Sequence, residues 1–63
     1  MYKVTWIDIF KVIKREKVDY STALRILMDE GVEESIATLW LGHENPLIGM
    51  VTEEGYVLKM KKA

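Results

Sequence analysis

Few residues in this chain have catalytic potential, and His43 is the first of them. It is the only histidine and precedes Glu44, and an imidazole beside a carboxylate can act as a general base. The chain has no cysteine, so a zinc site built from thiolates and several imidazoles is excluded. It has no Ser/His/acid grouping at plausible spacing and no Gly-rich phosphate loop. We therefore predict a protein that is not an enzyme, uses no cofactor and holds no metal.

A local resemblance bears on the same histidine. The segment from Ala23 to His43, ending in Leu39-Trp40-Leu41-Gly42-His43-Glu44, is similar to the stretch before the late active-site histidine of tyrosine recombinases. The resemblance implies an active-site position for His43, and it covers about a third of the chain. The family's His-x-x-Arg motif is replaced by Asp19-Tyr20-Ser21-Thr22, and Thr52 stands where the nucleophilic tyrosine is expected. We therefore predict no recombinase activity.

Carboxylates without cations fill the middle of the chain. Seven acids and no Lys or Arg lie between Met28 and Tyr56, and all nine basic residues lie outside this window. Such a surface speeds and orients association with a basic partner. The main prediction is a small regulatory or inhibitory module that binds a protein with a basic surface. The acids expected to make this contact are Glu33, Glu34, Glu53 and Glu54, with Val51, Val57 or Leu41 as the apolar anchor.

The basic residues suggest a second kind of partner. They gather before and after the acidic window, and Lys and Arg are the residues that neutralise nucleic-acid phosphates. The alternative prediction is therefore a DNA-binding transcriptional regulator or accessory factor. Its nucleic-acid contacts would be Lys11, Lys14, Arg15, Lys59, Lys61 and Lys62. A solvated helix face and a solubilising C-terminal fringe account for the same residues without any ligand.

Three helices are the first elements that we expect to position these groups. Thr5 and Asp8 have the spacing of a capping box, and apolar residues recur at helical spacing after them, which predicts a helix over residues 5–17. Asp19 as N-cap and Gly31 as C′ residue predict a second helix over residues 20–30. A third helix is predicted over residues 33–41, because Gly42 and Asn45-Pro46 end it.

A β-hairpin over residues 47–61 is predicted to follow the helices. Its loop is Glu53-Glu54-Gly55, which suits a type I turn closed by a G1 bulge. In that register Ile48, Met50 and Thr52 oppose Met60, Leu58 and Tyr56, and this face packs on the helices. Tyr2-Lys3-Val4 is a candidate for a short additional strand at the N-terminus.

These elements predict one α+β domain over residues 1–63. Three short helices followed by a hairpin resemble the winged-helix family, in which the third helix enters the major groove and the hairpin is the wing. Here Glu33 and Glu34 begin that third helix, so protein binding takes precedence over DNA. No apolar run exceeds three residues and no secretory signal is visible, so we predict no membrane contact and a cytoplasmic location. A homodimer is a further way to stabilise so short a chain.

Overall fold

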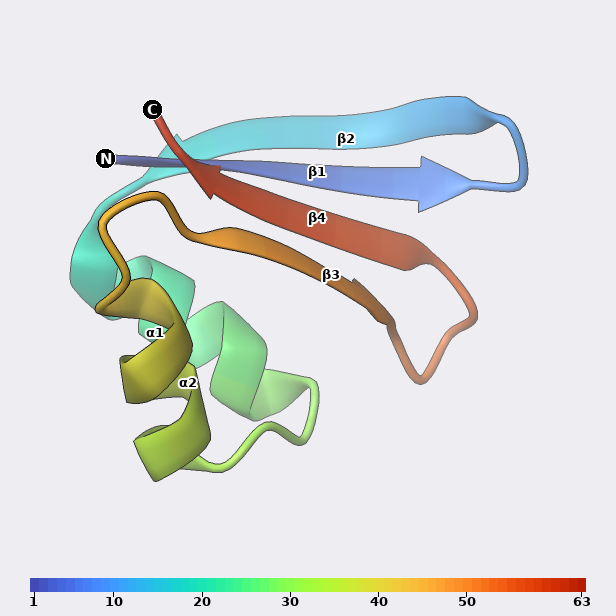
Figure 1. The fold of residues 1–63 in the computed structure, drawn as a ribbon. Helices are drawn as coiled ribbons and strands as arrows, with labels where there is room; N and C mark the ends of the chain where they lie inside the picture. The colour runs from blue at the N-terminus through green and yellow to red at the C-terminus, as the bar shows by residue number, and fades with distance from the viewer.

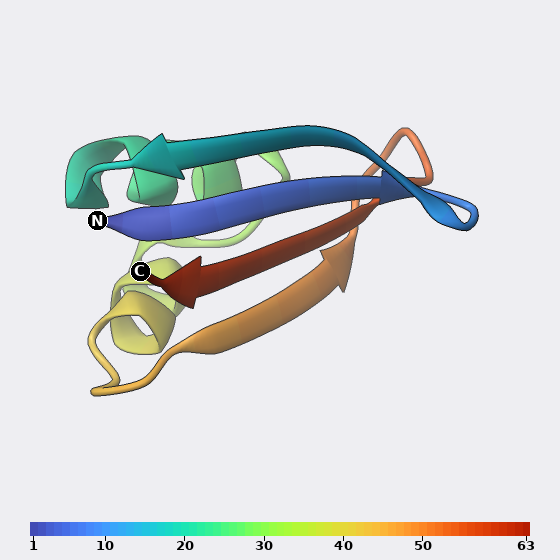
Figure 2. The ribbon, with the colours of Figure 1, turned by 90° about the horizontal axis from the view of Figure 1, so that it is seen from above.

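The fold is a four-stranded antiparallel sheet with two helices packed on one face. A computed structural model describes residues 1–63, with strand order β2-β1-β4-β3. Both helices lie beneath the sheet in Figure 1, and the opposite face carries no helix, as the view from above shows (Figure 2). The elements are β1 Tyr2–Asp8, β2 Lys11–Val18, α1 Tyr20–Asp29, α2 Glu34–Leu41, β3 Leu47–Val51 and β4 Val57–Lys62.

The predicted helix over residues 5–17 is wrong, because this segment forms most of the β1–β2 hairpin. Trp6 packs against the core, but Ile9 is 80% exposed and Phe10 is 98% exposed, so the residues at helical spacing do not share a buried face. Alternation decides the structure instead: Tyr2 and Val4 are buried while Lys3 between them is exposed. The many β-branched residues of this segment also favour a pleated strand over a helix.

The other two predicted helices are confirmed within a residue or two at their ends. The Asp19 carboxylate accepts a hydrogen bond from the Thr22 N–H at 2.9 Å, which caps the start of α1. Gly31 has a φ of +93°, and the Gly31 and Val32 N–H groups donate to the Met28 and Leu27 carbonyls. This is a Schellman ending, and it turns the chain tightly toward α2.

The C-terminal hairpin is confirmed in extent and in register. Met50 pairs with Leu58 and Ile48 with Met60. Its loop closes as predicted, with Gly55 at a φ of +91° and its N–H donating to the Thr52 carbonyl. The buried Thr52 hydroxyl accepts from the Tyr56 N–H at 3.1 Å, so the one buried polar side chain is satisfied.

The core lies between the helices and the inner face of the sheet. Leu27 of α1 belongs to the same buried cluster as alternate residues of the two central strands, among them Val4 and Leu58, and all three are fully buried. The Tyr2 hydroxyl donates to the Leu41 carbonyl at 3.4 Å, which ties β1 to the end of α2. Leu41 is therefore a core residue, and its predicted role as an exposed anchor is wrong.

The fold also overturns the winged-helix prediction. A third helix is missing, and the strand suggested at Tyr2-Lys3-Val4 instead runs to Asp8 and pairs with both β2 and β4. The first and last strands are therefore the two central strands of the sheet, and the Ala63 N–H donates to the Met1 carbonyl at 2.9 Å. Both chain ends lie at the same end of the sheet (Figure 2).

Candidate nucleic-acid interface

The uncovered face of the sheet, which we call the open face, carries three cross-strand rows of side chains. The rows follow from the pairing register, because residues opposite each other across a ladder point to the same face. From the β2 edge to the β3 edge, the first row is Lys17, Lys3, Lys61 and Leu47. The second row is Arg15, Thr5, Lys59 and Gly49, and the third row is Val12, Ile7, Val57 and Val51.

The first two rows hold five cations and no acid. Lys3 stands directly opposite Lys17 on one side and Lys61 on the other. Like charges placed directly opposite each other destabilise a sheet, so this arrangement has a cost in the unbound protein. The two acids of the strands, Asp8 and Glu16, occupy register positions on the helix side. Glu16 pairs with Val4, and its carboxylate forms the single ion pair of the chain, with the Lys14 ammonium at 3.4 Å. The open face therefore has no internal neutralisation.

Two shallow hollows lie on this basic half of the face. One has a volume of about 410 Å³ and is lined mainly by β1 and β2, with Arg15, Glu16 and Lys17 on its wall. The other, of about 270 Å³, is lined by β1, β3 and β4, with Lys59 on its wall. Lys3, Thr5 and Lys61 line both hollows, so the two form one continuous surface across the sheet, on which Glu16 is the single acid among five cations.

The open face has no aromatic side chain. Tyr2 is buried on the helix side, and Trp6 lies on that side as well, with the Lys14 ammonium 4.8 Å from its ring centroid. Stacking on aromatic side chains is the main way in which proteins hold the bases of single-stranded nucleic acid. The open face therefore offers charge to a phosphate backbone and no platform for bases.

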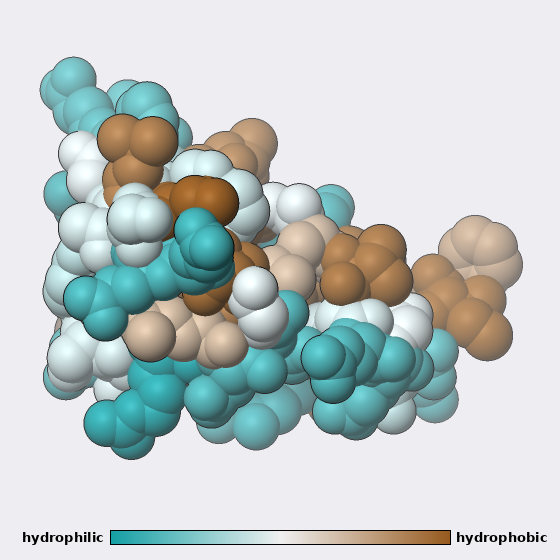
Figure 3. All heavy atoms as spheres, turned by 90° about the horizontal axis from the view of Figure 1, so that it is seen from below, coloured by the Kyte–Doolittle hydropathy of each residue, from teal (hydrophilic) through white to brown (hydrophobic).

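The third row is apolar, and it lies at the end of the sheet that carries both hairpin turns. The β1–β2 turn at this end presents Ile9 and Phe10, the two most exposed apolar side chains of that hairpin. In Figure 3, which views the helix side, hydrophobic side chains also form the far end of the molecule, beyond the helices. Charge is thus confined to the end of the open face near the chain termini.

The structure brings together three of the six cations predicted for nucleic acid. Arg15, Lys59 and Lys61 share the open face, whereas Lys14 and Lys62 occupy register positions on the helix side. Lys11 pairs with Asp8 beside the turn and lies outside the basic rows. None of these residues lies on a first helix, so that part of the prediction is wrong.

Lys3 and Lys17 were missed as site residues. Their signal was alternation: Tyr2, Val4 and Trp6 form an inward series, which directs Lys3 outward. Lys17 becomes part of the site only when residues 11–18 are recognised as a strand, because a helix would have placed it with Lys14.

The four predicted acids fall into two groups. Glu33 is the N-cap residue of α2 without a side-chain cap, and Glu34 lies in the first turn, where the helix dipole favours a carboxylate. Glu53 and Glu54 form the β3–β4 turn. The Glu53 N–H donates to the Glu30 carboxylate at 3.4 Å, which places this turn against the end of α1. No hydrogen bond joins this turn to Glu33 or Glu34.

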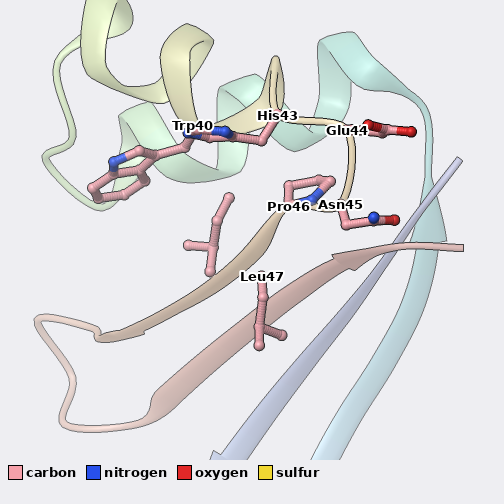
Figure 4. Close-up of a pocket in the computed structure, with 7 residues that line it drawn as sticks. Trp40, His43, Glu44, Asn45, Pro46 and Leu47 are labelled. Atoms are coloured by element: carbon pink, nitrogen blue, oxygen red, sulfur yellow. The ribbon is translucent and has the colours of Figure 1, made fainter.

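His43 lies at an open hollow of about 490 Å³ between the end of α2 and the start of β3. Figure 4 shows its imidazole directed toward Trp40, whereas the Glu44 carboxylate points away from it. His43 is exposed, and no hydrogen bond joins the two side chains. This geometry does not form a base held by an acid.

No group of three or more His, Asp or Glu side chains is placed to hold a metal ion. Neither helix has the length and apolar character needed to cross a bilayer. Comparison with protein-family models, curated proteins and solved structures found no match to this chain.

Proposed function

We propose that this protein binds double-stranded DNA through the basic half of its open face. The observation that carries the proposal is the set of five cations in two adjacent rows without an acid among them: Lys3, Arg15, Lys17, Lys59 and Lys61. Neutralising phosphates releases counterions, and this term supplies most of the sequence-independent affinity of DNA-binding proteins. The partner is a repeating anion, because the cations themselves repeat across three strands.

The spacing of the cations supports a phosphate backbone as the ligand. Neighbouring strands lie about 4.8 Å apart, and the two rows are separated by about 7 Å along the strands. Such a grid places several ammonium groups against consecutive phosphates. The lack of aromatic side chains on this face favours duplex over single-stranded DNA, since a single strand gains affinity from base stacking. Binding of this kind discriminates little between base sequences, because phosphate contacts position a protein without reading bases.

Neighbouring lysines at the end of β4 provide a matched test. Lys61 lies in the first basic row, and Lys62 pairs with Tyr2 on the helix side, so the two differ in face but hardly in sequence position. We expect Lys61→Ala to weaken binding to a random-sequence duplex and to reduce the slope of log K against log salt by about 1. Lys62→Ala should leave both quantities close to the wild-type values. Fluorescence anisotropy over a salt series measures affinity and slope together.

A second matched pair lies on β2, where Arg15→Ala should act like Lys61→Ala and Lys14→Ala like Lys62→Ala. Equal loss from Lys61→Ala and Lys62→Ala would contradict binding through one face. Tighter binding to a single strand than to a duplex would contradict the duplex assignment. If an acidic peptide of the same charge competes as well as duplex DNA, the ligand is an acidic protein and the proposal fails.

The acidic protein-binding surface is a second candidate function. The observation that favours it is the Glu53–Glu30 contact, which joins two acidic segments distant in sequence. A basic partner would bind there while the open face stays free. Charge reversal of Glu53 and Glu54 to Lys should abolish capture of a cationic test protein, and reversal of Lys61 and Lys59 to Glu should not. Capture that is insensitive to Glu53 and Glu54 would remove this candidate.

A further inference from the structure

The two edges of the sheet differ in how well they are protected against pairing with another strand. The β2 edge has five charged residues among eight and a bulge where the β1 register shifts between Trp6 and Ile7. Charges and bulges are the devices that prevent edge-to-edge association. The β3 edge has the sequence Leu-Ile-Gly-Met-Val, with no charge and no bulge in its pairing with β4. Figure 2 shows β3 as the outermost strand on its side.

The free backbone groups of β3 can be assigned from the hairpin hydrogen bonds. The Thr52 N–H donates to the Tyr56 carbonyl at 2.7 Å, so the backbone of Thr52 points toward β4. The direction of the backbone N–H and C=O groups alternates along a strand, so those of Met50 and Ile48 also point toward β4. The N–H and C=O groups of Leu47, Gly49 and Val51 therefore point outward. They form a set of three donors and three acceptors at the free edge.

We propose that β3 pairs antiparallel with β3 of a second copy of this chain, about a two-fold axis at Gly49. Gly49 then faces Gly49 of the second copy, and Leu47 faces its Val51 on both sides of the axis. This register uses every outward N–H and C=O group of the five-residue strand. It opposes no like charges, because β3 carries none.

The exposure of two apolar side chains supports this register. Leu47 is 81% exposed and Val51 is 66% exposed, and both lie on the open face at the β3 edge. In the pair Leu47 and Val51 of the two copies are cross-strand neighbours in a hydrogen-bonded pair, with Cα atoms about 5.5 Å apart, so their side chains pack against each other. Gly49 has no atom within 4 Å of where a Cβ would lie, so nothing in the protomer explains the absence of a side chain there. At the axis the two Gly49 residues face each other without side chains, so the side-chain contacts of this register come from Leu47 and Val51.

A second copy fits this edge better than it fits the β2 edge. Self-pairing of β2 would bring Lys11, Lys14, Arg15 and Lys17 against their own copies with one acid, Glu16, to offset them. The interface through β3 is small, since five residues a side bury less than the roughly 1,200–2,000 Å² of a stable complex. The association is therefore weak and concentration-dependent. The inference does not depend on the proposed DNA binding, although pairing would extend the open face across eight strands.

Mass measurement tests the inference directly. We expect sedimentation equilibrium of the wild-type chain to show an average mass rising from 7.3 kDa toward twice that value. The concentration range should run from about 10 µM to about 1 mM, which covers weak association. Leu47→Lys combined with Val51→Lys should keep the mass at the monomer value, because charges would then face each other across the axis. Both residues are exposed, and circular dichroism checks that the variant keeps its fold.

Val12→Lys is the matched control, because it adds one charge to the same face at the other edge. It should associate like the wild type. Amide exchange provides a second measurement on the unaltered protein: the Gly49 N–H should become protected as concentration rises, and the N–H groups of β2 should not. A wild-type mass that stays at the monomer value over the whole range would overturn the inference. So would association that survives the double substitution or is lost equally in Val12→Lys.

Discussion

The two hairpins of this protein have the same role in the sheet, but only one of them has a glycine at the turn position with positive φ. Each supplies one central strand and one edge strand. The β3–β4 turn places Gly55 at a φ of +91°, where glycine is free of strain. The β1–β2 turn places Ile9 at a φ of +53°, a conformation that is unusual for a β-branched residue. A hairpin can therefore form without turn residues that favour it when the flanking strand is held by a third strand.

The largest expected effect is a difference in the loss of stability between a substitution in the central strand β4 and a substitution in the edge strand β2. Leu58 of β4 is fully buried, so Leu58→Ala removes contacts on the core side and should lower the free energy of unfolding by about 2–5 kcal/mol. Ile13 of β2 is 43% exposed, and Ile13→Ala should cost about 1 kcal/mol or less. Urea denaturation measures both. Equal losses would mean that the two hairpins contribute alike to the core.

A smaller effect is expected at the turn that has the suitable residue. Gly55→Ala forces an L side chain into positive φ, although no neighbouring atom obstructs the new Cβ. The strain should lower the free energy of unfolding by about 1–2 kcal/mol. The β3–β4 hydrogen bonds next to the turn should also exchange faster with solvent. An unchanged urea midpoint would show that this turn does not depend on glycine.

The opposite substitution should relieve the other turn. Ile9→Gly removes an exposed side chain from positive φ, where Ile costs about 1–2 kcal/mol. Glycine also makes the unfolded chain more flexible, which offsets part of the gain. We expect a net increase of roughly 0.5–1 kcal/mol in the free energy of unfolding. A loss of stability would indicate that Ile9 makes contacts that offset its backbone strain.

The smallest effect concerns Asp19, which joins the first hairpin to α1. Hydrogen bonds from Thr22 hold the pKa of Asp19 below its ordinary value of 3.8. The larger contribution is from the Thr22 side chain and the smaller from its backbone N–H. A lowered pKa in the folded state adds stability that is present above 3.8 and is lost as the pH falls through the folded-state pKa. Asp19→Asn keeps a good cap but cannot titrate. The wild type should therefore lose more stability on acidification than Asp19→Asn. Urea denaturation at several pH values measures this, and an equal loss in the two proteins would contradict the role given to the Asp19 carboxylate.

The sequence predicted the elements whose ends carry chemical signals. Asp19 and Gly31 delimit α1, Gly42 and Pro46 follow α2, and Gly55 closes the second hairpin. The first hairpin has no such signal, since Asp8-Ile9-Phe10-Lys11 contains neither glycine nor proline. Its bulge also interrupts strict alternation in β2, and the same apolar residues fit helical spacing by chance. Only pairing with β4, a contact between distant segments, distinguishes the two structures.

The candidate site was predictable only in part for the same reason. The cations of the C-terminal strand lie in a hairpin whose register was predicted correctly, so Lys59 and Lys61 could be placed together. Lys3 and Lys17 join them only through the β1–β4 and β1–β2 ladders. A net charge of −1 gave no hint of a basic face, because the acids lie in other parts of the fold.

The hydrogen bond between the Ala63 N–H and the Met1 carbonyl has a mechanical consequence. The chain ends belong to neighbouring antiparallel strands and lie at the same end of the sheet (Figure 2). A force applied to the two ends therefore peels β1 from β4 one pair at a time, starting at Tyr2 and Lys62, and does not shear the whole ladder at once. Under tension the pairs between β1 and β4 should therefore break one after another at low force, however firmly the core resists denaturant.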